Sequence, residues 1–253
     1  SEMCIRDRSY TGKAVSPAPA VTYGGKKLVK NTDYTVSYSK NTAIGQASVK
    51  ITGKGLYKGT KTVNFNIRPA TVTKLKVSST GEKSVKLSWK KVTGADSYAI
   101  YRYDSTSKKW QRIKTVKAVS FTDSGLARAK GYSYKVKAVK KSGGKEYISA
   151  SYSKAIEAVT KPAKASCTAK SAGSGSIEVS WKAVGGASGY EIYSSSNGSD
   201  YVKSAKVGGS QKSAIVSGFE PYSLRMVKVR AYKTVNGKTS YGAFSQAAMV
   251  IVR

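Results

Sequence analysis

Few residues in this sequence have the type and spacing that catalysis needs. There is no His, which removes the commonest general base, the commonest metal ligand and the usual pH switch. Ser and Lys are plentiful, but without a surrounding motif a Ser–Lys nucleophile is best explained as chance proximity. The acidic residues lie singly, mostly beside expected turns, so we interpret them as solvated groups or local caps rather than as a pair for sugar hydrolysis. Beyond the first eight residues they are Asp33, Glu82, Asp96, Asp104, Asp123, Glu146, Glu157, Glu178, Glu191, Asp200 and Glu220.

Metal and cofactor motifs are also absent from the sequence. A calcium site needs clustered oxygen ligands, and no Asp-x-Asp run occurs. Cys167 alone is not a zinc site, and we expect no disulfide framework, because Cys4 lies in a stretch excluded from the fold below. No Gly-rich loop leads from a strand into a helix, as a phosphate-binding loop would. We therefore predict no catalytic, cofactor-binding or metal-binding residues, and a protein that is not an enzyme.

The charge of the chain is extreme. It has 45 Lys and Arg against 13 Asp and Glu, a formal net charge of +32, and only 9 of the basic residues are Arg. Sequence-specific contacts to bases favour Arg, whereas a Lys surface is a diffuse field that draws anionic polymers without choosing among them. We predict an anionic cell-wall polymer or an acidic glycan as the partner, and no sequence-specific nucleic acid. The alternative, of equal weight, is a solvated surface that prevents aggregation.

Two aromatic residues are candidates for ligand contact. Trp110 lies in Lys108-Lys109-Trp110-Gln111-Arg112-Ile113, which predicts an edge strand, and Tyr201 occupies the matching place further along. An exposed flat ring stacks on sugars or bases. The interpretation that we favour is that the ring packs over the sheet edge, because Trp is mostly buried in proteins.

The chain is organised around a long internal repeat. Its motif returns 92 residues later, as Trp89 and Trp181 show. The two runs are Ser84-Val85-Lys86-Leu87-Ser88-Trp89 with Tyr98, and Ser176-Ile177-Glu178-Val179-Ser180-Trp181 with Tyr190. Alternation of apolar and polar residues predicts strands with one dry face. The period is the size of a small sandwich domain, so we expect a first copy over residues 70–160 and a second copy over 161–253.

A shorter N-terminal segment, residues 9–68, precedes the two copies. Alternating runs separated by Gly and Asn predict strands near 33–38, 47–52 and 62–67, with a turn at Gly24-Gly25. The run Ile51-Thr52-Gly53-Lys54-Gly55 with Tyr57 and Gly59 resembles the small immunoglobulin-like repeats of bacterial surface proteins. Pro69 and Pro162 lie at the two junctions, where a fixed φ stiffens a linker and suits a rod.

The first eight residues follow none of these patterns. Met3-Cys4-Ile5-Arg6-Asp7 resembles the translated end of a transposon adapter used in sequencing libraries. We therefore interpret Ser1–Arg8 as an adapter or cloning scar and exclude it from the fold. A natural disordered tail is the alternative. Under the first interpretation, the natural N-terminus is not in the sequence, so the lack of a signal peptide says nothing about secretion.

Residues 70–253 resemble tandem fibronectin type III domains. The resemblance rests on the Trp and Tyr residues above, the turns Gly125-Leu126 and Gly218-Phe219, and the runs Val136-Lys137-Ala138 and Val229-Arg230-Ala231. It implies seven-stranded sandwiches without disulfides, with a structural core that includes Trp89, Tyr98, Tyr132, Trp181 and Tyr190. It also makes Tyr132 a tyrosine corner. Arg225 occupies the equivalent place in the second copy, so we expect that copy to be less stable.

The sequence thus predicts an all-β chain of three tandem β-sandwich modules, at 9–68, 70–160 and 161–253. Its Lys-rich and Tyr-rich style is similar to that of secreted proteins of Gram-positive anaerobes, which implies an extracellular, cell-envelope setting. We predict a non-catalytic spacer or adhesion segment of a larger surface or secreted protein. Two alternatives stay open: accessory modules of a secreted hydrolase, or a binding module that uses loops at one sandwich end. No window is long and apolar enough to cross a membrane.

Overall fold

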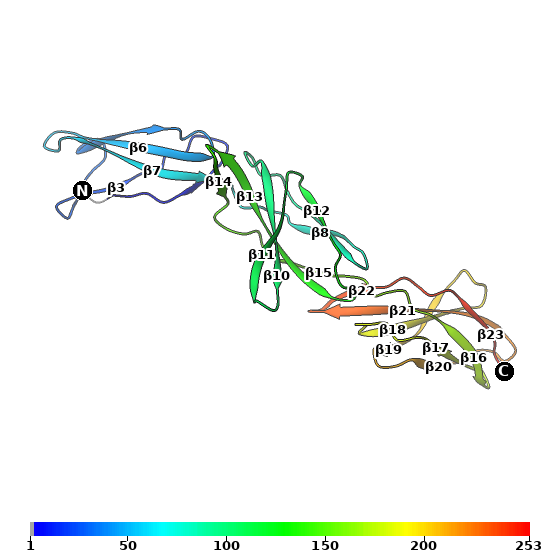
Figure 1. The fold of residues 1–253 in the computed structure, drawn as a ribbon. Helices are drawn as coiled ribbons and strands as arrows, with labels where there is room; N and C mark the ends of the chain where they lie inside the picture. The colour runs from blue at the N-terminus through cyan, green and yellow to red at the C-terminus, as the bar shows by residue number, and fades with distance from the viewer. Residues whose placement is uncertain (1–2) are drawn as a thin grey trace. The chain divides into compact units, whose positions relative to one another are not determined.

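The computed structural model describes residues 3–253, and over this range the regular structure is entirely β-strand (Figure 1). The predicted all-β fold is confirmed. No helix long and apolar enough for a membrane span occurs in the described residues. The chain divides into two compact units: one comprises Ser1–Lys76, Ser88–Phe121 and Tyr134–Ile156, and the other comprises Val77–Leu87, Thr122–Ser133 and Glu157–Arg253. The division into three modules stays a prediction.

The N-terminal segment folds into two small sheets. Their strand orders are β2-β7-β6-β5 and β1-β3-β4. Side chains from both sheets, among them Val21, Tyr34 and Val49, pack into one core, as the alternation in the sequence predicts. The strands are β1 (Met3–Cys4), β2 (Arg8–Ser9), β3 (Ala20–Tyr23), β4 (Lys26–Lys27), β5 (Tyr34–Ser39), β6 (Gly45–Gly53) and β7 (Thr60–Arg68).

Two short strands within residues 3–9 pair with these sheets, although we excluded Ser1–Arg8 from the fold. Strand β1 runs antiparallel to β3, and β2 runs parallel to β7. The Asp7 carboxylate accepts a hydrogen bond from Arg68 Nε at 2.6 Å and one from the Asn66 backbone N–H at 3.0 Å. A sheet edge offers unpaired N–H and C=O groups to a neighbouring strand of any sequence. The exclusion from the fold was therefore wrong, while the origin of the stretch as a scar stays a prediction.

Each copy of the repeat contains a three-stranded and a five-stranded sheet. In the first copy the orders are β12-β9-β8 and β11-β10-β13-β14, with β15 also on β13. These strands are β8 (Lys76–Thr80), β9 (Ser84–Ser88), β10 (Ser97–Asp104), β11 (Lys109–Val116), β12 (Ser120–Ser124), β13 (Gly131–Ser142), β14 (Lys145–Ile148) and β15 (Ile156–Val159).

The second copy repeats this order. Its sheets are β16-β17-β20 and β19-β18-β21-β22, with β23 also on β21. Ile177 and Val179 of one sheet pack with Tyr190, Ile192 and Val229 of the other, so this copy is a sandwich with an apolar core. The strands are β16 (Thr168–Gly173), β17 (Ser176–Ser180), β18 (Gly189–Ser195), β19 (Val202–Gly208), β20 (Ser213–Ser217), β21 (Leu224–Val235), β22 (Lys238–Tyr241) and β23 (Ala248–Ile251).

The last strand of each copy is split in two, which gives eight strands where the resemblance implied seven. Side-chain hydroxyls replace part of the ladder between the pieces. Ser149 and Ser153 accept hydrogen bonds from the N–H groups of Ala138 and Val136 at 3.3 and 3.0 Å. Ser245 does the same for Val229 at 3.0 Å. These serines are buried. Their hydroxyls give the buried N–H groups of the neighbouring strand the hydrogen-bond partners that such groups need.

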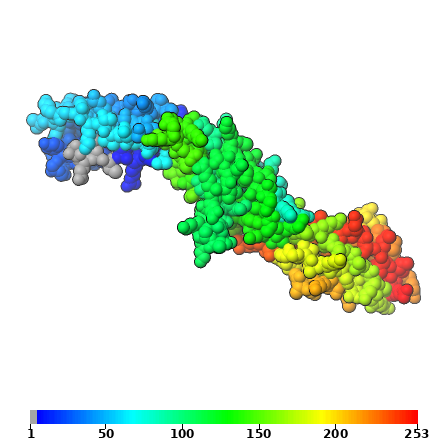
Figure 2. Space-filling model, viewed as in Figure 1, coloured from blue at the N-terminus to red at the C-terminus, as the bar shows by residue number. Residues whose placement is uncertain are grey.

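Both junction prolines are buried. Within the first unit, Tyr147 of β14 packs with Ile44, Phe65 and Ile67 near Pro69. Figures 1 and 2 show the β13–β14 hairpin against the ends of β6 and β7. Within the second unit, Asn236 Nδ2 donates to Glu157 Oε1 at 2.9 Å, and Lys238 Nζ donates to the Glu157 carbonyl at 3.0 Å. Side chains as well as backbone therefore hold the residues around each junction.

Candidate anion-binding faces

Trp110 lies on the outer strand β11 of the five-stranded sheet in the first copy, directly across from Tyr103 on β10. Their ring centroids are 5.4 Å apart. Lys135 on β13 places its ammonium 4.4 Å from the Trp110 ring centroid and 5.3 Å from that of Tyr152. Trp110 is half-buried, so it is neither a free flat platform nor a core residue. It forms a cation–π pair on the outer face of the sheet.

Lys137 lies two residues after Lys135 on β13, so its side chain is on the same face of the sheet. Its Nζ lies 4.2 Å from the Tyr152 ring centroid and donates to the Ala150 carbonyl at 3.1 Å. Burial, and then the nearby charge of Arg68, lower the pKa of Lys137 below its ordinary value. No carboxylate among the described residues forms an ion pair with Lys137, so an anion arriving here meets two ammonium groups and the rings of Trp110 and Tyr152. We call Trp110, Lys135, Lys137 and Tyr152 the first-copy face.

Tyr201 occupies the matching position in the second copy, immediately before β19. Lys228 on β21 places its Nζ 4.0 Å from the Tyr201 ring centroid. Lys228 pairs with Tyr193 in the β18–β21 register, as Lys135 pairs with Tyr101 in the first copy. The lysine-over-ring pair is therefore repeated at the same register position. Both aromatic residues singled out from the sequence belong to such pairs.

Glu191 is an acidic residue whose environment the sequence did not predict. It is neither solvated nor a cap, because its side chain is 2% exposed and lies across from Arg230. Arg230 donates to Glu191 Oε2 through Nε at 3.0 Å and Nη2 at 2.7 Å. Lys203 Nζ lies 3.4 Å from Oε1. Burial raises the pKa of Glu191, but the hydrogen bonds and charges of Arg230 and Lys203 outweigh it and hold this pKa below its ordinary value.

Three aromatic rings enclose Arg230. Its guanidinium carbon lies 4.1 Å from the ring centroid of Tyr241, 4.8 Å from that of Phe244 and 5.2 Å from that of Tyr193. Arg230 Nη2 also donates to the Tyr193 hydroxyl at 2.9 Å. A planar guanidinium suits such a site, because it stacks on rings while two of its N–H groups donate to one carboxylate oxygen. This cluster neutralises a cation inside the protein and leaves little of it for a ligand.

The other acidic side chains of the described residues mostly fit the expectation. The Lys140 ammonium, 2.9 Å from Asp96, holds the pKa of that carboxyl below its ordinary value. Asp104 caps its own turn by accepting from the Thr106 N–H at 2.9 Å, although Asp123 is buried. Within residues 3–253 no three His, Cys, Asp or Glu come together as a metal site would require.

The structural residues differ between the copies. Trp89, Tyr98, Trp181 and Tyr190 are all buried. Tyr98 and Tyr190 accept hydrogen bonds from the N–H groups of their own Val92 and Val184 at 2.9 and 2.7 Å. Trp181 Nε1 donates to the Gln211 carbonyl at 3.1 Å, whereas Trp89 Nε1 has no hydrogen-bond partner among the described residues.

The corner position also differs. The half-buried Tyr132 accepts a hydrogen bond from the Ala127 N–H at 2.9 Å, which is the contact a tyrosine corner makes. Arg225, its counterpart, stacks over Phe219 at 5.0 Å. Its buried Nε has no hydrogen-bond partner among the described residues. An unpartnered buried donor costs free energy, and each copy has one among the described residues, Trp89 Nε1 in the first and Arg225 Nε in the second. The lower stability of the second copy therefore stays a prediction.

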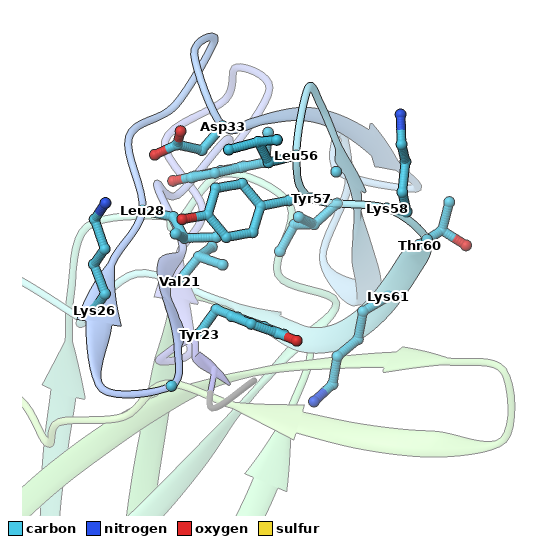
Figure 3. Close-up of a pocket in the computed structure, with 15 residues that line it drawn as sticks. Val21, Tyr23, Lys26, Leu28, Asp33, Leu56, Tyr57, Lys58, Thr60 and Lys61 are labelled. Atoms are coloured by element: carbon cyan, nitrogen blue, oxygen red, sulfur yellow. The ribbon is translucent and has the colours of Figure 1, made fainter.

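A separate hollow of about 930 Å³ lies in the N-terminal segment. Tyr23 and Tyr57 meet edge to face in it, with ring centroids 5.7 Å apart. Leu56 and three lysines stand around the rings (Figure 3). The sequence pattern did not reveal this hollow, because its walls come from separate turns.

Over 100 residues the chain is 40% identical to a poly(3-hydroxybutyrate) depolymerase of Ralstonia pickettii. The match covers 40% of this chain and 18% of the depolymerase, so the chain matches less than a fifth of that relative. No protein-family model matches the sequence.

Two solved structures of fibronectin type III domains are similar to the chain. One holds domains FN1–FN3 of chicken CNTN1, with 17% identity and a TM-score of 0.39, and it covers 82% of this chain and 76% of that one. The other is a two-domain segment of chicken tenascin, with 17% identity and a TM-score of 0.43, and it covers 72% of this chain and 98% of that one.

Proposed function

We propose that this chain is a non-catalytic spacer and adhesion segment of a larger extracellular bacterial protein, and that its lysine-bearing sheet faces bind anionic polymers. The observation that carries the proposal is the repeated lysine-over-ring pair, Lys135 with Trp110 and Lys228 with Tyr201. An ammonium held on an outer sheet face reaches a phosphate or carboxylate. The ring beside it offers an apolar surface to the sugar or glycerol between charges.

The net charge supports the same function. A formal charge of +32 raises the local concentration of any polyanion around the chain. Lysines act as point charges and do not demand the planar partner that Arg prefers. Binding of this kind selects by charge density rather than by sequence, as attachment to a wall polymer requires.

The spacer role draws on the junctions. Buried Pro69 and Pro162 fix φ where the segments meet. Tyr147, beside the first junction, and Glu157, near the second, each contact residues beyond it. Such contacts oppose free rotation about a linker and favour a stiff connection.

The experiment is sedimentation of the chain with purified Gram-positive walls, compared with the same walls stripped of teichoic acid. We expect binding to the intact walls that falls at least about tenfold between roughly 50 and 500 mM NaCl, because salt screens exposed charges. Binding that persists unchanged at high salt, or that is equal on stripped walls, would contradict the electrostatic mechanism.

A second candidate function is favoured by the depolymerase match. The chain then consists of accessory modules of a secreted hydrolase, with the catalytic domain elsewhere in the same polypeptide. The 100 matched residues make up 18% of that enzyme, so the match is confined to a small part of it. Reading the source DNA across both ends of this sequence decides between the two: an adjoining hydrolase domain supports the accessory role, and further repeats with a wall anchor support adhesion.

A further inference from the structure

The hollow in the N-terminal segment begins with a tight hairpin. Tyr23 ends β3 and pairs with Lys26, which begins β4. Gly24 and Gly25 form the loop with φ of 56° and 78°, and two consecutive positive φ values are those of a type I′ turn, which Gly adopts without strain. This turn fixes Tyr23 at the edge of the hollow, with its side chain exposed to solvent. The residue is 62% exposed, which is unusual for a large aromatic residue.

The opposite wall is the loop between β6 and β7. It is closed by the Gly53 N–H donating to the Gly59 carbonyl at 2.9 Å, and it is tied to Asp33 by the Lys54 N–H at 2.9 Å. A side chain at Gly53 would collide with the Tyr57 carbonyl, so this backbone approach requires glycine. The loop holds the Tyr57 ring against Tyr23 and leaves Leu56 96% exposed. An ordered loop that displays an apolar side chain in a hollow is a feature of ligand sites.

The charges around the hollow are mostly positive. Lys26 lies on one side of the tyrosine rings, and Lys58 and Lys61 lie on the other (Figure 3). Among the described residues, the one carboxylate in the lining is that of Asp33, and it accepts a hydrogen bond from the Val29 N–H at 2.8 Å within its own turn. A ligand that fits this lining carries negative charge and also presents an apolar face to the rings.

We propose that the hollow binds a uronic-acid unit of an acidic glycan, with the sugar ring packed on Tyr23, Tyr57 and Leu56 and the carboxylate between the lysines. This inference rests on the proposed function, because it names one polymer class and a specific site for it. A volume of about 930 Å³ is within the range of small-ligand pockets, roughly 300–1,000 Å³. Phosphate polymers without sugar rings satisfy the lysines and leave the apolar wall uncovered.

The test is a titration of the full chain with a tetrasaccharide of galacturonic acid, followed by amide chemical shifts in NMR. Salt of about 500 mM suppresses diffuse binding to the sheet faces. We expect saturable shifts at Gly24, Gly25, Gly55 and Gly59. The fully methyl-esterified tetrasaccharide should bind at least about tenfold more weakly, because it retains the sugar rings and loses the charges.

Two variants and a control assign the site. Leu56→Asp changes an exposed side chain, so it preserves the fold, and Tyr23→Ser removes one ring; each should weaken binding about tenfold or more. Lys50→Glu, on β6 in the same segment and outside the hollow, should leave it unchanged. Equal affinity in Leu56→Asp and the parent chain, or equal affinity for the methyl ester, overturns the inference.

The outcome also separates this inference from the proposed function. A variant with Lys135, Lys137 and Lys228 changed to Gln should lose capture by teichoic acid-bearing walls at low salt and keep its affinity for the tetrasaccharide. Wall capture without tetrasaccharide binding overturns the hollow as a site and leaves the proposed function standing. Tetrasaccharide binding without wall capture overturns the proposed function and supports the hollow.

Discussion

The two copies of the repeat differ in the residues at one pair of facing positions on their third and sixth strands. Where the second copy has Glu191 across from Arg230, the first copy has Ala99 across from Lys137. In the second copy the cation is held by a buried carboxylate and three rings. In the first copy the ammonium lies over one ring and meets a backbone carbonyl. At this position the second copy therefore neutralises its cation from within, and the first copy keeps its charge for a partner.

The difference shows that one sheet can either stabilise its copy or present charge, according to a single cross-strand pair. A buried ion pair is costly to assemble and more costly to break, because removal of one partner leaves the other charge unpaired. An outer lysine over a ring is replaceable at little cost to folding. The following substitutions separate the two roles.

The largest effect is expected from Arg230→Met. It leaves Glu191, which is 2% exposed, without the guanidinium that donates two hydrogen bonds to its Oε2. We expect the second copy to lose about 3–5 kcal/mol of stability, measured by urea unfolding with hydrogen exchange read separately for each copy. Lys137→Met is the matched control in the first copy and should cost less than about 1 kcal/mol. Equal losses of stability in both copies would show that the buried ion pair contributes no more than the exposed lysine does.

A smaller effect is expected from acid. The pKa of Glu191 is held below its ordinary value of 4.5 in the folded chain. The stability that it contributes is thus fully present above pH about 4.5 and is lost as the pH falls through the lowered folded value. Unfolding of the second copy, followed from pH 7 to pH 3, should show this loss. Glu191→Gln should remove that component of the pH dependence, and an unchanged profile would contradict the assignment.

The corner position should give the smallest effect on stability. Tyr132→Phe removes the acceptor of the Ala127 N–H and should cost the first copy about 1 kcal/mol. Arg225→Tyr introduces the missing corner and removes a buried unpartnered Nε, so we expect it to stabilise the second copy by a similar amount. Thermal unfolding of each variant measures both changes. A destabilised Arg225→Tyr would mean that the contact between Arg225 and Phe219 outweighs the corner.

Much of the fold follows from the sequence because burial repeats with the strand period. The recurring Trp and Tyr residues predict which faces are dry, and Gly24-Gly25 predicts a tight turn. The Glu191–Arg230 pair was missed because its partners lie 39 residues apart and meet only through the register of β18 and β21. A signal did exist: between the copies, Ala99 becomes Glu191 and Lys137 becomes Arg230, a change at both ends of one pair.

The lysine-bearing faces and the hollow could not be predicted from the sequence, because they depend on where side chains from separate strands meet. Nothing in local spacing brings Lys135 over Trp110, since the two lie on strands separated by β10. The hollow joins a hairpin to a loop that begins 27 residues after its end. Long-range pairing of this kind is set by sheet order, which a single sequence states only weakly.

The most direct test of the account compares two variants with equal net charge. Lys135→Gln with Lys137→Gln removes the open ammonium groups of the first-copy face, and Lys170→Gln with Lys203→Gln removes two lysines of the second copy that Glu178 and Glu191 already pair. We predict that the first pair weakens binding to teichoic acid-bearing walls at low salt roughly tenfold, and the second pair only about two- to threefold. Equal weakening by the two pairs would mean that net charge alone governs binding, and it would contradict the distinction between an open and an internally neutralised face.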